Sequence, residues 1–203
     1  MARILEIRPQ DPDHRVVSET VRALENGQVV CYPTDTIYGL GVDLLHKKAM
    51  KRVEQIKQKS HLPLSFICSD FNMVSQFARV DNATFKIMKR CLPGPFTFVL
   101  PATNKAPDFL LFKKKTVGIR IPDYPFCQLL VEELGRPVLS TSVPSGEGEV
   151  LNDVMEIDSR LGDQIDLIID GGRLDSVPST VVEIVDREIT ILREGKGNID
   201  LIY

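Results

Sequence analysis

The chain has no tryptophan, three histidines and four widely spaced cysteines in 203 residues. No two of the cysteines, at positions 31, 68, 91 and 127, are closer than 23 positions, which excludes a CxxC redox pair and a zinc ribbon. Each cysteine is expected to be a small buried hydrophobic residue in a reducing cytoplasm. The histidines at 14, 46 and 61 have unrelated spacings, so no histidine metal site is predicted.

The sequence also has no long hydrophobic run. None approaches the roughly 20 apolar residues that a bilayer-spanning helix needs, so no transmembrane helix and no membrane partner are predicted. Glu6, Arg8 and Asp11 fall where a signal peptide would be apolar, so a cytoplasmic location is predicted. With 43% hydrophobic and 26% charged residues, the chain has the composition of a globular protein, and its length predicts a single domain over residues 1–203.

Several motifs of known enzyme classes are missing. The sequence has neither a Walker loop nor GxGxxG, so a bound nucleotide would not be held by a P-loop or a Rossmann turn. It has no GxSxG elbow and no plausible Cys/His pair, which disfavours covalent catalysis. No catalytic nucleophile or base is therefore assigned. A transfer reaction that works by positioning and charge neutralisation remains compatible with the sequence.

The net charge of −3 hides a strong segregation of charge. Residues 46–120 contain 15 Lys or Arg against 4 Asp or Glu, whereas residues 147–203 contain 5 against 14. One explanation is a chance difference between exposed helices. The other is a cationic surface that attracts a polyanion such as a nucleotide or RNA. Total charge does not separate the two.

Hydrophobic periodicity predicts an α/β (α+β) fold. Helices are expected over residues 15–25, 46–58, 70–78, 81–91, 125–133 and 153–161. Strands are expected over residues 28–32, 64–68, 96–100, 117–121, 138–140, 166–170, 180–185 and 189–193, the last three as a C-terminal meander. Early alternation followed by consecutive strands favours one twisted, mixed sheet with helices packed on it.

Polar residues gather where the predicted strands end or begin. Thr34, Ser140 and Ser142 follow or close strands, Ser179 precedes one, and Arg193 closes the last. In open α/β sheets ligands bind beyond strand ends, so these positions predict a pocket. The alternative is ordinary turn and capping chemistry, which uses the same residue types.

Arg120 and two lysines are the charged candidates. Arg120 lies in an apolar strand, where its guanidinium requires an anionic partner. That partner is a structural carboxylate, Asp35 or Asp43, or else a substrate carboxylate or phosphate. Lys57 and Lys59 lie at the C-terminal end of a predicted helix. There a positive charge either interacts favourably with the helix dipole or neutralises a bound phosphate.

Six short motifs occur together and in a fixed order. They are Tyr32-Pro33-Thr34-Asp35-Thr36-Ile37-Tyr38-Gly39-Leu40, Pro93-Gly94-Pro95-Phe96-Thr97, Gly118-Ile119-Arg120-Ile121-Pro122, Ser140-Thr141-Ser142, Ser179-Thr180-Val181-Val182 and Arg193-Glu194-Gly195. The set resembles the YrdC/YciO family, whose best-known activity is threonylcarbamoyl-AMP synthesis. The resemblance implies a YrdC-like twisted, mixed open sheet with a positively charged cavity.

The resemblance also implies a reaction and its site. L-threonine and bicarbonate give a carbamate, whose carboxylate attacks the α-phosphate of ATP, so that pyrophosphate leaves; the product serves tRNA modification. The resemblance implies that Mg²⁺ accompanies ATP and is held by the phosphates more than by protein ligands. The implied threonine site is Thr34, Arg120 and Ser179. The implied nucleotide, phosphate or carbamate contacts are Lys57, Lys59, Ser140, Ser142 and Arg193.

Two departures from the synthase motifs resemble the YciO branch. Lys57-Gln58-Lys59-Ser60 replaces Lys-x-Arg-Pro, which removes a guanidinium fork. Ser142-Val143-Pro144 replaces Ser-Ala-Asn, which removes an amide side chain and a backbone donor.

The sequence is therefore compatible with three alternative functions. The first is a nucleotide-using enzyme of the threonylcarbamoyl-AMP synthase type with weakened activity. The alternative is an RNA-binding or translation-associated YciO-type protein, with tRNA or double-stranded RNA as partner, that kept the fold without the synthase activity. Its motivation is the basic segment, above all Lys113-Lys114-Lys115. The third is an enzyme on the same scaffold with another carboxylated substrate.

Overall fold

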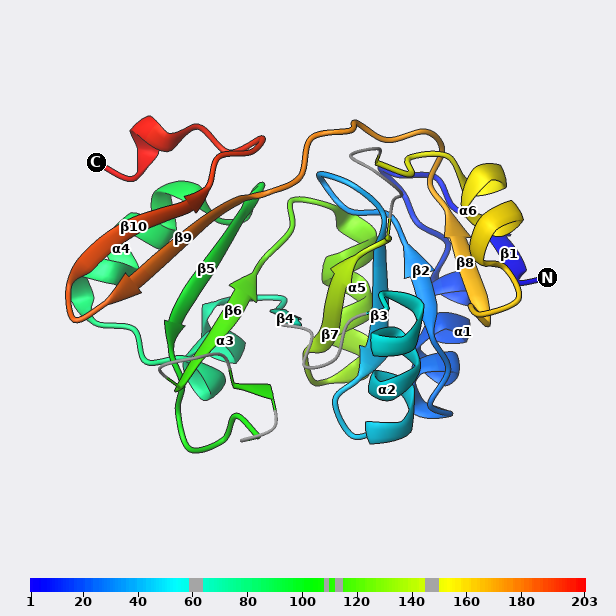
Figure 1. Ribbon diagram of the computed structural model, residues 1–203, viewed down its shortest axis with the longest axis horizontal. Coiled ribbons are helices and arrows are strands. Elements are labelled where there is room, and N and C mark those ends of the chain that lie inside the picture. The colour runs from blue at the N-terminus through cyan, green and yellow to red at the C-terminus, as the bar shows by residue number, and fades with distance from the viewer. Residues whose placement is uncertain (59–63, 108–109, 112–114, 145–149) are drawn as a thin grey trace.

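The computed structural model describes residues 1–58, 64–107, 110–111, 115–144 and 150–203. Within these residues, ten strands form one sheet in the order β1-β8-β2-β3-β7-β4-β6-β5-β9-β10 (Figure 1). The strands are β1 (Arg3–Glu6), β2 (Val30–Tyr32), β3 (Gly39–Asp43), β4 (Ser65–Ile67), β5 (Phe96–Pro101), β6 (Thr116–Arg120), β7 (Val138–Ser142), β8 (Leu167–Asp170), β9 (Thr180–Val185) and β10 (Glu188–Arg193). The sheet contains both parallel and antiparallel pairs of strands, so the predicted mixed, open sheet is confirmed.

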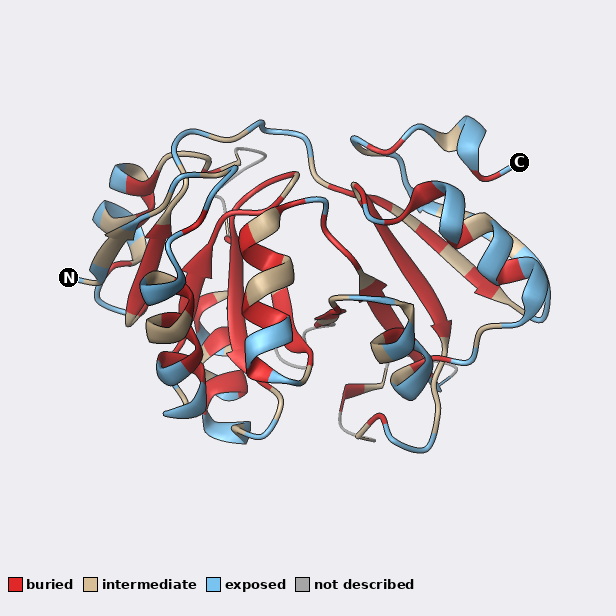
Figure 2. Ribbon diagram, turned by 180° about the vertical axis from the view of Figure 1, so that it is seen from behind, coloured by how far each residue is buried: buried red, intermediate tan, exposed pale blue. Residues whose placement is uncertain are grey.

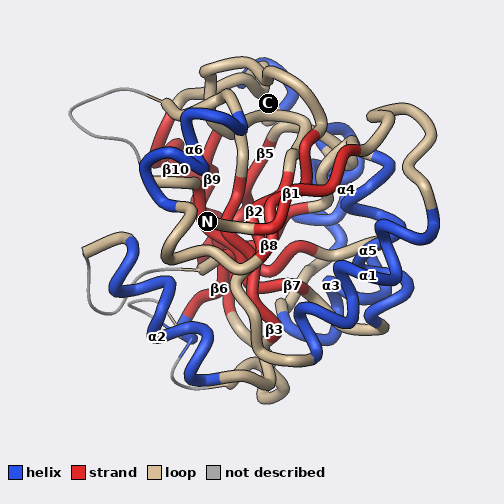
Figure 3. Tube along the Cα trace, turned by 90° about the vertical axis from the view of Figure 1, so that its right-hand side faces the viewer, coloured by secondary structure: helices blue, strands red, loops and turns tan. Residues whose placement is uncertain are grey.

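Helices cover both sides of this sheet. They are α1 (His14–Glu25), α2 (Lys47–Ile56), α3 (Phe71–Phe77), α4 (Asn82–Cys91), α5 (Pro125–Leu134) and α6 (Val154–Leu161), with a short 3-10 helix at Ile199–Leu201. Figure 3 shows α2 and α6 on one side of the strands and α1, α3 and α5 on the other. None of the described helices has the length and apolar character of a membrane span.

The predicted helix ends are set by local chemistry. The carboxylates of Asp70 and Asp81 accept hydrogen bonds from the backbone N–H groups of Met73 and Thr84, both at 2.8 Å, so each caps the first turn of its helix. Helix α5 begins with proline and ends at Gly135, whose φ of 69° is left-handed. These ends agree with the sequence prediction.

Three features of the sheet differ from the prediction. Strands β1 and β3 were not predicted; β3 contains Gly39 and Gly41, which weaken a strand pattern. The predicted C-terminal meander around Asp186-Arg187-Glu188 is present as the hairpin of β9 and β10, which turns at Asp186 and Arg187. Strand β8 is not part of it, because β8 pairs in parallel with β1 and β2. Parallel partners that are distant in sequence leave no local signal.

The chain between β8 and β9, residues 171–179, crosses from one end of the sheet to the other. Figure 1 shows it as the orange trace above the strands, between β8 on the right and β9 on the left. It therefore links the two halves of the sheet and delivers Ser179 to the start of β9.

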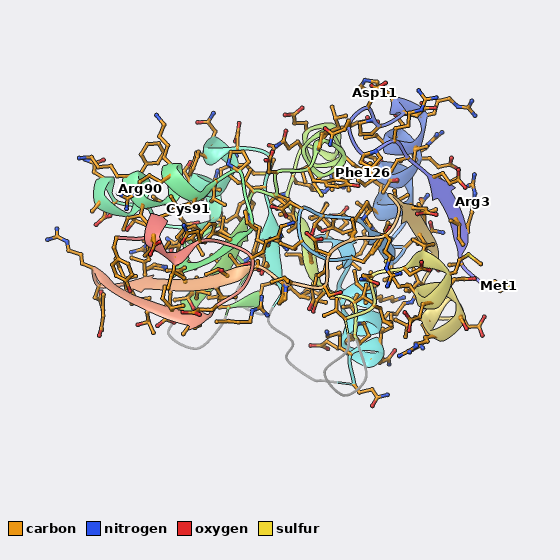
Figure 4. All side chains as sticks on the ribbon, turned by 90° about the horizontal axis from the view of Figure 1, so that it is seen from above. Met1, Arg3, Asp11, Arg90, Cys91 and Phe126 are labelled. Carbon is orange, nitrogen blue, oxygen red and sulfur yellow. The ribbon has the colours of Figure 1, made fainter. Side chains whose placement is uncertain are left out.

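Hydrophobic side chains fill both faces of the sheet, and the strands are largely buried in Figure 2. Helices α1 and α5 pack on Val30 and Tyr32 of β2, where Phe126 is fully buried. The C-terminal segment packs near the end of α4, where Figure 4 labels Arg90 and Cys91. The Nη2 atom of Arg90 donates to the carbonyl of Ile202 at 3.1 Å, which fixes that segment.

Candidate functional site

A cavity of about 1220 Å³ opens over the strands in the middle of the sheet. Of the predicted site residues, six line it: Thr34, Arg120, Ser140, Ser142, Ser179 and Arg193. Lys57 lies beside it, since its Nζ donates to the carbonyl of Ser142 at 3.0 Å. Lys59 lies outside the described residues. Residues from opposite ends of the sequence thus meet in one hollow.

Strand periodicity explains how Arg120 reaches the cavity. Along β6, Thr116, Gly118 and Arg120 line the cavity, while Val117 and Ile119 are fully buried in the core. Successive strand residues point to opposite faces, so a residue at the end of an apolar strand can still face the cavity.

Arg120 is paired with Asp35. Its Nη2 atom lies 2.8 Å from a carboxylate oxygen of Asp35 and donates to the hydroxyl of Thr36 at 3.1 Å. The side chains of Arg120 and Asp35 are 12% and 8% exposed. The Nε atom of Arg120 is buried and has no hydrogen-bond partner among the described residues. Asp35, one of the two structural carboxylates proposed from sequence, is therefore the partner.

The other proposed carboxylate, Asp43, pairs elsewhere. Its side chain is fully buried, and the Nη2 atom of Arg136 lies 2.5 Å from it. Asp43 also accepts from the backbone N–H of Leu45 at 3.0 Å. Asp43 thus joins β3 to the residues after α5 and takes no part in the cavity.

The hydroxyl of Thr34 is fully used within its own turn. It donates to the carbonyl of Ile37 at 2.7 Å and accepts from the backbone N–H of Thr36 at 3.1 Å. Because its single proton goes to Ile37, the 2.9 Å contact with the Thr36 hydroxyl is donated by Thr36. A chain of donors therefore runs from Arg120 through Thr36 to Thr34, and it fixes the direction of the guanidinium.

The second arginine that lines the cavity, Arg193, binds Ser179. Its Nε and Nη2 atoms donate to the Ser179 carbonyl at 3.1 and 2.8 Å, and Nη2 lies 3.2 Å from the Ser179 hydroxyl. The hydroxyl of Thr97 on β5 is 2.8 Å from that of Ser179. Burial within the site and the positive charge of Arg120 both lower the pKa of Arg193. The two guanidiniums therefore act on the same space.

The serines of β7 are held from two directions. Ser140 accepts a hydrogen bond at 2.8 Å from the phenol of Tyr32, which is buried beneath the cavity wall. Ser142 is exposed, and its backbone carbonyl accepts a hydrogen bond from Nζ of Lys57. The next backbone N–H, that of Val143, donates to the carbonyl of Tyr38 at 3.1 Å. Since the residue after it is proline, this part of the rim has few backbone donors for a ligand.

Charged side chains of both signs line the cavity. Among the described lining residues, the cations are Lys47, Lys51, Arg120 and Arg193, and the anions are Glu54 and Glu183. Within the same part of the chain, no group of three or more His, Cys, Asp or Glu side chains is placed to hold a metal ion.

Thr36, which the sequence places with Thr34 among the polar residues after the first long strand, does support the site. Sequence reasoning missed two other side chains. Thr97 lies in a quoted motif, and its position next to the start of a strand was the available signal. Tyr32 was taken only as a buried strand residue, because its partner Ser140 is more than 100 residues away in the sequence.

The family model Sua5/YciO/YrdC, described as "Telomere recombination", matches residues 22–195. The chain belongs to this family. The match includes every predicted site residue, and all residues that line the cavity lie within the matched range.

Relatives within this family include proteins of two kinds. The uncharacterized protein YciO of Escherichia coli (strain K12) is 39% identical over 205 residues, covering 98% of each chain. The threonylcarbamoyl-AMP synthase of Vibrio vulnificus (strain YJ016) is 35% identical over 160 residues, covering 76% of this chain and 86% of the synthase. The predicted likeness to the YciO branch is therefore confirmed.

Solved structures of family members have the same fold. The crystal structure of E. coli YciO superposes with a TM-score of 0.95 at 38% identity, over all of both chains. P. abyssi Sua5, crystallised with L-threonine, gives a TM-score of 0.86 at 27% identity. That match covers 95% of this chain and 57% of Sua5.

Proposed function

We propose that the chain is an enzyme of the threonylcarbamoyl-AMP synthase type that joins a threonine carbamate to AMP. In this reaction the amine of L-threonine and bicarbonate give a carbamate and water. A carbamate oxygen then attacks the α-phosphorus of ATP, and the bond to the β,γ-pyrophosphate breaks. The product is passed on for modification of a tRNA adenosine. The synthase named among its relatives supports this proposal.

One observation carries the proposal: two guanidiniums from different strands act on one cavity. Arg120 ends β6 and Arg193 ends β10, and the charge of Arg120 lowers the pKa of Arg193. Two cations that repel one another across a hollow are stabilised by a ligand with more than one negative charge. Threonine carbamate and ATP both meet this requirement, and ATP brings Mg²⁺ on its phosphates.

The residues divide between two ends of the ligand. Arg120 pairs with the threonine carboxylate through Nη1, the terminal nitrogen that Asp35 and Thr36 do not use. Ser179, held by Arg193, contacts the threonine or carbamate end. Ser140 and Ser142 on β7 contact the nucleotide or carbamate. The phosphates are assigned to Lys57 and to Lys59, which lies outside the described residues. Catalysis then rests on positioning and charge neutralisation, without a covalent intermediate.

The deciding experiment is direct. Purified protein is incubated with ATP, Mg²⁺, L-threonine and bicarbonate, and pyrophosphate release and threonylcarbamoyl-AMP are followed by mass spectrometry. We expect product that requires threonine and bicarbonate. Arg193→Ala is expected to lower the rate by at least about tenfold, whereas Arg15→Ala, an exposed arginine on α1, should leave it unchanged. Pyrophosphate release that does not depend on threonine, or the absence of any release, would contradict the proposal.

A further inference from the structure

The hydroxyls of Tyr32 and Ser140 meet across an intervening strand. They lie 2.8 Å apart, yet Tyr32 is on β2 and Ser140 is on β7, with β3 between them in the sheet. Adjacent strands are about 4.8 Å apart, so the two side chains and the hydrogen bond between them together bridge roughly 10 Å of sheet from β2 to β7. A contact of this length requires free space above β3.

Two glycines of β3 provide that space. Gly39 is paired with Tyr32, and Gly41 is paired with Ser140. A Cβ atom at Gly41 would lie 2.6 Å from the Tyr32 ring, and one at Gly39 would lie 3.0 Å from the Ser140 hydroxyl oxygen. Glycine weakens a strand interior, so two of them in a fully buried strand mark a close approach that larger residues would block.

The direction of the hydrogen bond determines what Ser140 offers the cavity. Tyr32 is 1% exposed, and burial raises its pKa, so its phenol stays protonated and donates. A serine hydroxyl has one proton to donate. No acceptor for that proton is present among the described residues, and Ser140 lines the cavity. The Ser140 proton is therefore available to a ligand oxygen.

We propose that Tyr32 is a positioning residue that turns Ser140 into a fixed hydrogen-bond donor toward an anionic oxygen bound in the cavity. The identity of that oxygen, on the carbamate or on a phosphate, rests on the proposed function. Tyr32 itself does not line the cavity and acts only through Ser140.

A double-mutant cycle tests this coupling. Affinities for inorganic pyrophosphate and for ATP with Mg²⁺ are measured by calorimetry on wild type, Tyr32→Phe, Ser140→Ala and the double variant. Tyr124→Phe is the matched control, because the Tyr124 hydroxyl is buried and has no partner among the described residues. Thermal unfolding of each variant separates loss of fold from loss of binding.

Each single variant is expected to weaken binding of at least one of these ligands by about fivefold, the value of one hydrogen bond. The double variant should bind no more weakly than Ser140→Ala, because Tyr32 has no effect without Ser140. Additive losses of about 25-fold in the double variant contradict the proposal. So does wild-type affinity in Tyr32→Phe. Tyr124→Phe should bind as wild type does.

A crystal structure of Tyr32→Phe without a ligand tests the positioning of Ser140 independently of any binding measurement. If the wild type bound neither ATP nor pyrophosphate and made no threonylcarbamoyl-AMP, the proposed function would fail. The positioning role would then be judged from Ser140 alone. We expect its hydroxyl to leave the wild-type rotamer or to occupy more than one. A single unchanged rotamer overturns the inference.

Discussion

The guanidinium of Arg120 and the carboxylate of Asp35 form a nearly buried ion pair at the wall of the cavity, 2.8 Å apart. The second carboxylate oxygen of Asp35 accepts from the backbone N–H of Asp123 at 3.2 Å. Asp35 thus holds the Nη2 atom of Arg120 in place, while another N–H group of the guanidinium remains for a ligand. A structural ion pair and a substrate contact are compatible in the same arginine.

Separating these two roles requires paired variants. Arg120→Ala leaves the Asp35 charge unpaired and should lower the free energy of unfolding by about 3 kcal/mol. Combining it with Asp35→Ala removes the unpaired charge, so stability should return in part while threonine use does not. Denaturant unfolding and threonine-dependent pyrophosphate release measure the two effects. Equal recovery of both would mean that Arg120 serves only the fold.

The loop after α2 offers a change that should increase activity. Lys59→Arg restores the guanidinium of the synthase motif, which binds phosphate oxygens with two parallel hydrogen bonds. We expect faster threonylcarbamoyl-AMP formation, by about tenfold. Lys48→Arg, an exposed lysine on α2, is the matched control and should change nothing. No gain from Lys59→Arg would mean that this loop has another purpose. Lys59 lies outside the described residues, so this prediction rests on the sequence.

Stability should depend on pH through Asp43. Burial alone raises the pKa of Asp43. The hydrogen bonds from Arg136 and from the backbone of Leu45, together with the charge of Arg136, outweigh burial, so the net pKa is lowered. A carboxyl with a lowered folded pKa stabilises the fold above its unfolded pKa of about 4, and this contribution is lost as pH falls through the folded value. Asp43→Asn should therefore be less stable than wild type at pH 7, by about 2 kcal/mol.

Urea unfolding over a pH series checks this linkage. The stability difference between wild type and Asp43→Asn should narrow as pH falls below about 4. The exposed carboxylates Asp81 and Asp163 also have lowered pKa values, but both proteins retain them, so their contributions cancel. A difference that stays constant with pH would show that Asp43 does not titrate in this range.

The RNA-binding alternative makes a separate prediction. Contacts from the basic segment to a phosphate backbone release counterions, so affinity for double-stranded RNA should fall at least about tenfold between 50 and 200 mM salt. Replacing Lys113, Lys114 and Lys115 by alanine should weaken binding, whereas Arg15→Ala should not. Fluorescence anisotropy of a labelled duplex gives both values. Affinity that is independent of salt would exclude this mode. Lys113 and Lys114 lie outside the described residues.

Local signals in the sequence predicted most of the helices and the region of the site. Capping residues such as Asp70 and Asp81 act within one turn, so their effect can be seen in the sequence itself. Polar residues at strand ends, such as Ser140 and Ser179, indicated the cavity for a similar reason. Strand β1 and the pairing of β8 depend on partners far away in the chain, and no local pattern encodes them.

The contacts between site residues were the least predictable part. The sequence allowed Arg120 either Asp35 or Asp43, and only the three-dimensional structure showed which carboxylate lay within reach. Tyr32 lacked any polar signal, since its phenol meets Ser140 only because two glycines open the intervening strand. Such supporting residues are determined by packing across the sheet rather than by their neighbours in sequence.

The crossing segment 171–179 makes the integrity of the site depend on one exposed connection. It joins β8 to β9 (Figure 1). Val177 within it is 46% exposed. A protease that cuts there would break the covalent link between β8 and β9 while the strands stay hydrogen-bonded. Ser179 would then be covalently attached on its C-terminal side, to β9, and would keep its hydrogen bonds to Arg193 and Thr97. A nicked molecule could thus remain folded and still lose the alignment of one cavity wall.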